Sequence, residues 1–116
     1  MEIQLIFEET TLSARLDDTV AARSFYDSLP LELTLTDYAS TEKISDLAKA
    51  LPVHSEPKGY QPKAGDITYY APWGNLAIFY KNFGYASGLV RLGEISDDIQ
   101  LLRKSGLLNV RIEATQ

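Results

Sequence analysis

The segment GDITYYAPWGNLAIFYKNFGYASGLVRLGEI, residues 65–95, contains more than half of the aromatic residues of the chain. It divides into three strand-like runs rich in aromatic and β-branched residues: DITYY, NLAIFYK and GLVRLGEI. The runs are separated by two glycine-bearing stretches, APWG and NFGYASG, which are typical of turns. The segment therefore predicts three strands joined by two turns.

The same two-residue alternation of apolar and polar side chains continues on both sides of this segment. It is clearest near the start of the chain, around residues 31–35 and at the end of the chain. Together with the three central runs, these segments give about seven strands. The alternating apolar positions outside the central segment include Ile3, Leu5, Phe7, Leu12, Ala14, Leu16, Leu31, Leu33, Leu35, Val110 and Ile112.

Two segments carry helical signals. In residues 18–29 the apolar residues follow helical spacing, Asp18 is a candidate cap, and Pro30 ends the pattern. In residues 97–105 an acidic first turn follows Ser96, and Gly106 ends the pattern. For residues 41–51 we expect at most a helical turn that leads into a long, proline-rich surface loop.

Length and composition indicate one globular domain spanning residues 1–116. The chain is 45% hydrophobic and 23% charged, and it contains no apolar run long enough to cross a membrane. The start of the chain lacks the basic region of a signal peptide, so we expect a soluble, cytoplasmic protein. The absence of cysteine excludes disulfides and a cysteine nucleophile, and the net charge of -5 argues against nucleic-acid binding.

Many short strands with two amphipathic helices favour a closed barrel whose ends the helices cover. The stretches TEKISDL (41–47), 59–95 and VRIEA (110–114) resemble the bacterial cyclophilin-like domains, a family of small barrels related in fold to prolyl isomerases. The resemblance extends nearly end to end. It implies a mostly β, closed eight-stranded barrel with two capping helices, about 18–29 and 97–105, and no established reaction.

The resemblance raises the question of prolyl isomerase activity, which in true cyclophilins relies on an arginine in an apolar groove. Lowering the barrier to peptide-bond rotation requires such a group to favour the twisted state. Arg91 and Arg111 each lie between two apolar residues of a strand, so both are expected to point to water. We therefore expect no isomerase activity and no enzyme, with a weak isomerase as the alternative.

Other catalytic chemistry finds little support in the sequence. His54 is the only histidine, and its loop setting beside Ser55 and Glu56 predicts an exposed side chain rather than part of a catalytic triad. The paired acids at 17–18 and 97–98 are explained by helix starts. We expect no metal and no cofactor, and we assign no catalytic residue.

The aromatic residues of the two central turns give the one candidate binding site. Individually these rings are explained by core or loop packing, but together they predict an apolar recess near the surface. Such a recess suits a small ligand or an extended peptide; an alternative is an accessory interaction domain beside a redox or hydrolase partner. The oligomeric state stays open. The candidate ligand-binding residues are Trp73, Asn75, Phe79, Phe83 and Tyr85.

Overall fold

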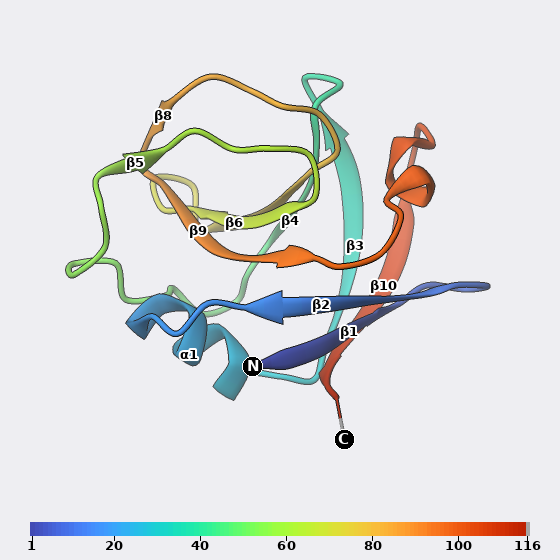
Figure 1. Cartoon of the computed structure of the whole chain (residues 1–116), viewed down its shortest axis with the longest axis horizontal. Helices are drawn as coiled ribbons and strands as arrows, with labels where there is room; N and C mark the ends of the chain where they lie inside the picture. Colours follow the sequence, from blue (N-terminus) through green and yellow to red (C-terminus); the bar gives the residue numbers. More distant parts are fainter. Residues whose placement is uncertain (116) are drawn as a thin grey trace.

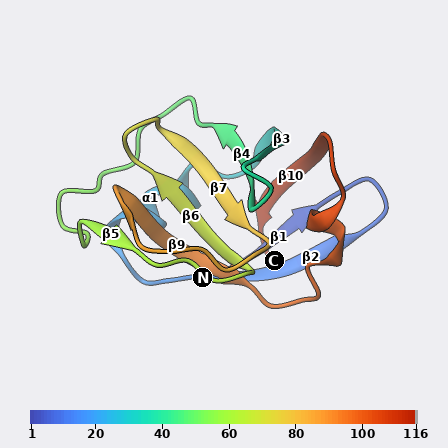
Figure 2. The ribbon, with the colours of Figure 1, turned by 90° about the horizontal axis from the view of Figure 1, so that it is seen from above.

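The structure, a computed structural model, describes residues 1–115 and is dominated by a closed barrel of eight antiparallel strands (Figures 1 and 2). Around the barrel the strands follow the order β1-β10-β3-β4-β7-β6-β9-β2. The predicted mostly β, eight-stranded closed barrel is thus confirmed. The strands are β1 (Glu2–Ile6), β2 (Thr11–Leu16), β3 (Leu31–Tyr38), β4 (Glu42–Asp46), β6 (Asp66–Tyr70), β7 (Asn75–Phe79), β9 (Leu89–Ile95) and β10 (Leu108–Ala114).

The alternating apolar residues face the barrel interior and form its core. In β2 buried and exposed residues alternate strictly, as the period of a strand requires. The segment 65–95 supplies β6, β7 and β9, which are neighbours in the barrel. Buried residues of the interior cluster include Ile3, Leu5, Leu12, Ala14, Leu16, Leu35, Ile67, Tyr69, Leu76, Ile78, Val90, Leu92, Val110 and Ile112.

The strand that the residue pattern alone missed is β4, because residues 41–51 were expected to form a helical turn. Instead, β4 pairs with β3 on one side and with β7 on the other, so it completes the barrel between these two strands. Its inward side chain is Lys43, which is fully buried, and its outward neighbour is Ile44. Because the inward residue is a lysine, the alternation of apolar and polar residues that marks the other strands is absent from β4.

Gly93 lies at the junction where β2 and β9 close the barrel. A Cβ atom at this position would overlap the carbonyl oxygen of Arg15 on the neighbouring strand. Leu16 is the register partner of Gly93, so the two backbones approach closely at this point. Glycine is therefore required at this place by the close approach of two strands.

The first predicted helix is present, with shorter bounds. Helix α1 (Val20–Asp27) begins after Thr19, whose hydroxyl accepts a hydrogen bond from the backbone N–H of Ala22. Thr19, rather than Asp18, is thus the cap. The buried face of α1, formed by Ala21, Ala22 and Phe25, belongs to the same cluster as the barrel interior.

The second predicted helix, 97–105, is wrong. The segment forms only a short 3-10 helix, η1 (Gln100–Arg103), so the barrel has one short α-helix instead of two capping helices. Asp97 does not start a helix, because its carboxylate accepts a hydrogen bond from the N–H of Ser13 at 2.6 Å. Leu102 of η1 is nevertheless fully buried in the core cluster. In Figure 1 α1 and the orange-red segment that contains η1 lie on opposite sides of the barrel.

Two loops cross the outside of the barrel and pair with each other. Their short strands, β5 (Gly59–Tyr60) and β8 (Ala86–Ser87), form a separate two-stranded sheet. Figure 1 shows this pair at one side of the molecule, beside β6 and β9. The ring of Tyr85 occupies the space in which a side chain at Gly59 would lie. The loops thus cover part of the outer barrel surface.

Candidate functional site

The outer face of β4, β7 and β9 carries a second apolar cluster, separate from the barrel interior. Its buried members are Ala77, Phe79 and Leu89, and Ile44 and Tyr70 pack against them. Phe79 is only 2% exposed although it points out of the barrel. The outer face is therefore apolar where an antiparallel barrel would normally be solvated.

A cavity of about 220 Å³ opens over this cluster. It is smaller than the 300–1,000 Å³ that is usual for drug-sized ligands, so it suits a small molecule or a single side chain. We call it the aromatic pocket. It is lined by Tyr38, Ala39, Glu42, Ile44, Tyr70, Trp73, Asn75, Phe79, Phe83, Ala86 and Leu89.

The walls of the aromatic pocket are aromatic rings held by mutual contacts. Trp73 reaches from the turn between β6 and β7 to Tyr38 at the end of β3, with ring centres 5.4 Å apart in an edge-to-face arrangement. It makes a similar contact with Tyr70 at 5.3 Å. Phe79 and Phe83 lie 6.4 Å apart. These geometries fall in the range of favourable aromatic pairs, which fixes the rings around the cavity.

Three of these rings stay accessible to solvent. Trp73 is 57% exposed, Phe83 is 47% exposed and Tyr38 is 44% exposed. Exposed large aromatic side chains gathered at one cavity are characteristic of recognition surfaces rather than of monomer surfaces in general.

Glu42 places a carboxyl group among these rings. The residue is half-buried, and its one side-chain hydrogen bond is a long contact of 3.5 Å from the hydroxyl of Thr41. No lysine or arginine of residues 1–115 forms an ion pair with it. Burial away from water disfavours the carboxylate and raises the pKa of Glu42 to about 7.

Asn75 contributes a buried amide to the opposite part of the aromatic pocket. The residue is 2% exposed, and its Nδ2 donates a hydrogen bond to the carbonyl oxygen of Leu76. Its Oδ1 has no partner, the one such buried side-chain oxygen or nitrogen in the described part of the chain. A buried acceptor without a donor is unfavourable, and a ligand with a donor group would satisfy it.

The structure brings together four of the five residues that the sequence nominates. Trp73, Asn75, Phe79 and Phe83 all line the aromatic pocket. Tyr85 does not line it; this ring is 65% exposed and lies over Gly59 on the outer loops.

Sequence reasoning missed Tyr38 and Glu42. They reach the aromatic pocket because Tyr38 pairs with Glu42, and Glu42 pairs with Phe79 in the register of β3, β4 and β7. No local motif marks these two residues. Only the assignment of β4 as a strand between β3 and β7 would have placed them beside the aromatic turns.

None of the residues that line the aromatic pocket is an arginine. The side chain of Arg91 points out of the barrel, as the sequence predicts. It forms ion pairs there instead of extending freely into solvent. Its guanidinium bonds Asp17 and Asp66, each at 2.8 Å, which leaves it only partly exposed. This pairing is structural because it ties β9 to the segment after β2 and to β6.

The buried Lys43 is held in a second polar cluster, on the interior side of β4. Its ammonium donates to the carbonyl oxygens of Lys104 at 2.6 Å and Gly106 at 2.8 Å, and it lies 3.0 Å from Asp37. The Tyr80 hydroxyl also donates to Asp37, at 2.8 Å. The bonds from Lys43, and then from Tyr80, lower the pKa of Asp37. Three acceptors thus use the three donors of Lys43.

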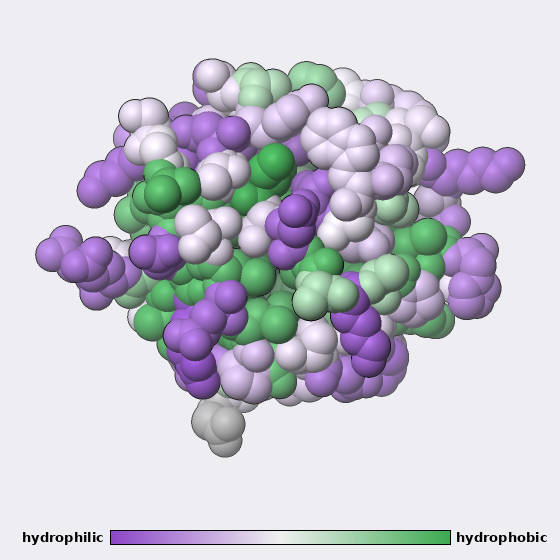
Figure 3. All heavy atoms as spheres, turned by 180° about the vertical axis from the view of Figure 1, so that it is seen from behind, coloured by the Kyte–Doolittle hydropathy of each residue, from purple (hydrophilic) through white to green (hydrophobic). Residues whose placement is uncertain are grey.

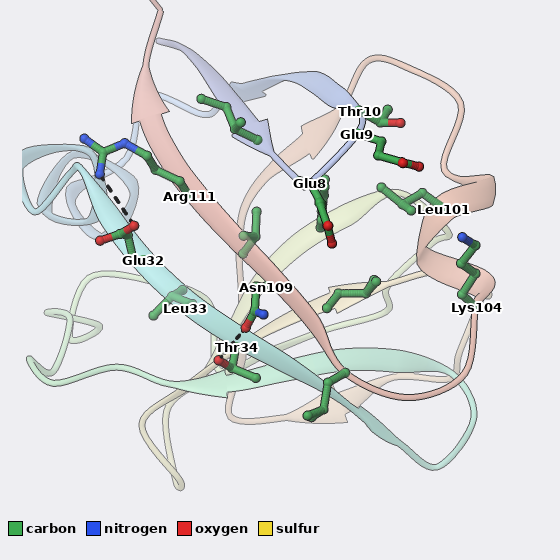
Figure 4. A pocket seen from close by; sticks show the side chains of 15 residues that line it. Glu8, Glu9, Thr10, Glu32, Leu33, Thr34, Leu101, Lys104, Asn109 and Arg111 are labelled. Atoms are coloured by element: carbon green, nitrogen blue, oxygen red, sulfur yellow. Dashed lines mark hydrogen bonds and ion pairs between the residues drawn. The ribbon is translucent and has the colours of Figure 1, made fainter.

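A wider, shallower hollow of about 800 Å³ lies between the β1–β2 turn, η1 and the outer faces of β3 and β10 (Figure 4). Figure 3 shows hydrophobic residues exposed between hydrophilic ones on the side of the molecule that carries β3 and β10. In Figure 4 two pairs of the labelled polar groups interact: Thr34 with Asn109, and Arg111 with Glu32. The one buried side-chain oxygen or nitrogen without a partner in residues 1–115 belongs to Asn75, so this hollow, which we call the β3–β10 basin, holds no such group.

The described residues show neither a metal-binding cluster nor a membrane-spanning helix. Within residues 1–115 no group of three or more histidine, cysteine, aspartate or glutamate side chains is arranged to hold a metal ion. His54 is exposed. No helix in the described range has the length and apolar character to cross a membrane.

Comparison with known proteins gives the context of this fold. The comparison with curated proteins found no match. Among solved structures, the chain is similar to the solution structure of the hypothetical protein AF2241 from Archaeoglobus fulgidus, with a TM-score of 0.74 and 19% sequence identity. The match covers 99% of this chain and 95% of that chain, and at this identity it shows a shared fold. The model of the Cyclophilin-like family matches residues 5–113, so the chain belongs to the Cyclophilin-like family.

Proposed function

We propose that this domain binds a small ligand in the aromatic pocket and does not isomerise prolyl peptide bonds. The observation that carries the proposal is the unpartnered, buried Oδ1 of Asn75, a residue that lines a cavity whose walls are largely aromatic rings. Ligand sites commonly combine an apolar lining with a few polar groups that fix the ligand's orientation. The aromatic pocket has this composition, with Glu42 and Asn75 as its polar groups.

The exposed rings provide the driving force for binding. A ligand that lies between Trp73, Phe83 and Tyr38 removes apolar surface from water, which contributes about 25 cal/mol for each Å². Trp73 and Tyr38 already contact each other, so little side-chain freedom is lost when a ligand enters. The size of the cavity favours a small molecule over a long peptide segment.

The arrangement of the arginines supports a binding role over an isomerase role. Arg15, Arg23 and Arg111 pair with acids at the surface, and Arg91 is held by two carboxylates. The fifth arginine, Arg103, belongs to η1, and no arginine lines the aromatic pocket, so none is available there to a prolyl nitrogen. A protease-coupled assay over several X-Pro peptides is expected to show the uncatalysed rate, and a rate above that background would contradict this part of the proposal.

The binding role is tested by NMR on the ¹⁵N-labelled protein with a set of small aromatic and aliphatic compounds. Binders are expected to shift the resonances of Asn75, Phe79 and Phe83. The Trp73→Ala variant is expected to weaken binding at least about tenfold, in line with the loss of a central interface aromatic. Tyr85→Ala is the matched control, because Tyr85 is an exposed aromatic residue outside the pocket.

The two variants separate the outcomes. Equal affinities of Trp73→Ala and the unchanged protein, with both folded by circular dichroism, would overturn the assignment of the pocket. Weakening by Tyr85→Ala to the same extent would show that the outer loops, not the aromatic pocket, hold the ligand.

A further inference from the structure

We propose that the ligand of the aromatic pocket is a small organic ammonium ion, with Glu42 as its counter-ion. This inference rests on the proposed binding function and names the chemical class of the ligand. It follows from three features of the aromatic pocket: a carboxyl group without an ion-pair partner, several aromatic rings that line the cavity, and a buried acceptor that needs a donor.

The first feature is the missing partner of Glu42. The nearest lysine in sequence, Lys43, points to the other side of the strand and uses its three donors on Asp37, Lys104 and Gly106. No other lysine or arginine of residues 1–115 lies within ion-pair distance of Glu42. A half-buried carboxylate that is not neutralised by the protein attracts a cationic ligand.

The second feature is the aromatic wall. Tyr38, Tyr70 and Trp73 form one connected group of rings, and Phe79 and Phe83 form another. Tryptophan and tyrosine faces attract ammonium groups electrostatically, and the attraction grows when the cation is shielded from water. A cavity that joins such rings to a carboxyl group thus favours an organic cation over a neutral compound of the same shape.

The third feature is the position of Asn75. In the pairing of β4 with β7, Glu42 lies opposite Phe79 and Asp46 lies opposite Asn75. Glu42 and Asn75 are therefore separated by four residues along the strands, or about 13 Å at 3.3 Å per residue. Between them lie apolar groups, including Ile44. This order suits an ammonium group on an apolar stem, with a second hydrogen-bond donor that reaches Asn75.

The same features disfavour an anionic ligand. Glu42 is the only ionisable acid or base among the lining residues apart from the two tyrosines. An anion would meet this carboxylate with no cation in the pocket to compensate for it. The net charge of -5 also favours the approach of cations over anions.

The test uses three probes that share one apolar body: phenethylammonium, 2-phenylethanol and 3-phenylpropanoate. Affinities are measured at pH 8 by the fluorescence of Trp73, the only tryptophan of the chain, and by NMR shifts of pocket residues. Phenethylammonium is expected to bind at least about fivefold more tightly than 2-phenylethanol. The carboxylate is expected to bind most weakly.

The Glu42→Gln variant identifies the counter-ion. It is expected to remove the preference for phenethylammonium over 2-phenylethanol, because the ammonium group loses its counter-ion. Glu9→Gln, an exposed position in the β1–β2 turn, makes the same change in net charge outside the aromatic pocket. It is expected to leave all three affinities unchanged.

The outcomes separate the two proposals. If 2-phenylethanol binds in the aromatic pocket as tightly as phenethylammonium, the ammonium inference is overturned and the binding function stands. If the preference survives Glu42→Gln, Glu42 is not the counter-ion and the inference is likewise overturned. If no probe shifts a pocket resonance, both proposals are contradicted.

An ammonium group can come from a free amine or from a lysine side chain, and a fourth probe distinguishes these sources. The blocked tripeptide Ala-Lys-Ala presents the same group on a peptide. Weaker binding of the tripeptide than of phenethylammonium supports a free amine, which the small cavity favours. Tighter binding, lost in Glu42→Gln, supports recognition of the same group on a polypeptide.

Discussion

Glu42 and Phe79 lie directly opposite each other on β4 and β7, and both side chains line the aromatic pocket. Phe79 is buried although it faces outward, and Glu42 is half-buried beside it. The barrel register thus places an ionisable group against an apolar surface. This arrangement links the fold to the electrostatics of the pocket.

The first prediction concerns the ionisation of Glu42. Because burial disfavours the carboxylate, the pKa of Glu42 is expected at about 7, compared with its ordinary value of 4.5. The hydrogen bond from the Thr41 hydroxyl lowers the pKa of Glu42, but by less than burial raises it; the charge of Glu42 in turn helps to raise the pKa of Tyr80. An NMR titration of the Glu42 side-chain carboxyl carbon measures this value directly, and a midpoint near 4.5 would contradict it.

The raised pKa of Glu42 also has a consequence for stability. Between pH 4.5 and 7 the folded protein retains the proton that the unfolded chain loses, so the contribution of Glu42 to the free energy of unfolding falls as pH rises. The Glu42→Gln variant lacks this loss. Its stability relative to the unchanged protein is therefore expected to be higher at pH 8 than at pH 5, as measured by urea unfolding.

The second prediction concerns the buried Lys43. The Lys43→Met variant keeps much of the volume but leaves Asp37 and two backbone carbonyls without their shared donor. Breaking a buried ion pair typically costs 3–5 kcal/mol, and the partial exposure of Asp37 lowers the expected loss to about 2–3 kcal/mol. Urea unfolding checks this loss.

The exposed Lys81, which follows β7 in the chain, offers the matched control. Lys81→Met is expected to change the free energy of unfolding by less than about 0.5 kcal/mol. Equal stabilities of the two variants would show that the Lys43 cluster does not stabilise the barrel.

The third prediction concerns barrel closure at Gly93. The added methyl group of Gly93→Ala would overlap the carbonyl oxygen of Arg15, so β2 and β9 must separate. Such overpacking is expected to destabilise the protein by about 1–3 kcal/mol or more and to speed amide exchange in Leu16 and Asp17. At Gly84, by contrast, a Cβ atom would meet no atom within 4 Å. A Gly84→Ala variant as unstable as Gly93→Ala would argue against this account of closure.

The fourth prediction separates stability from binding at Asn75. The Asn75→Leu variant removes a buried oxygen that has no partner, an arrangement that costs about 1–3 kcal/mol. Its stability is expected to equal or exceed that of the unchanged protein, while ligands with a donor group bind more weakly. Thr68→Val is the comparison, because the Thr68 hydroxyl is buried and donates to Ala77 at 2.8 Å. A larger loss of stability in Asn75→Leu than in Thr68→Val would contradict the prediction.

Much of the fold could be predicted from the sequence because inward-facing apolar residues follow the strand period. The segment 65–95 gave β6, β7 and β9 with both turns. β4 could not be recognised in the same way, because its inward residue is Lys43 and its partners are carbonyls of residues 104 and 106. The prediction of a second helix was wrong because Asp97 accepts a hydrogen bond from the N–H of Ser13 instead of starting a helix. This contact joins segments that are distant in sequence, so the local pattern does not reveal it.

The residues of the candidate site also differ in how well the sequence predicts them. Trp73, Asn75, Phe79 and Phe83 lie close together in sequence, so a local excess of aromatic residues pointed to them. Glu42 and Tyr38 come from the β3–β4 hairpin and enter the aromatic pocket only through its pairing with β7. Local sequence motifs do not reveal which strands pair or in which register, so they could not place these two residues.

The central claim, that the aromatic pocket holds the ligand, is tested most directly by intermolecular nuclear Overhauser effects between a bound probe and the protein. With phenethylammonium, cross-peaks are predicted to the rings of Trp73 and Phe79 and to the methyl groups of Ile44, all of which line the pocket. Cross-peaks confined instead to Leu33 and Leu108, in the β3–β10 basin, would contradict the account.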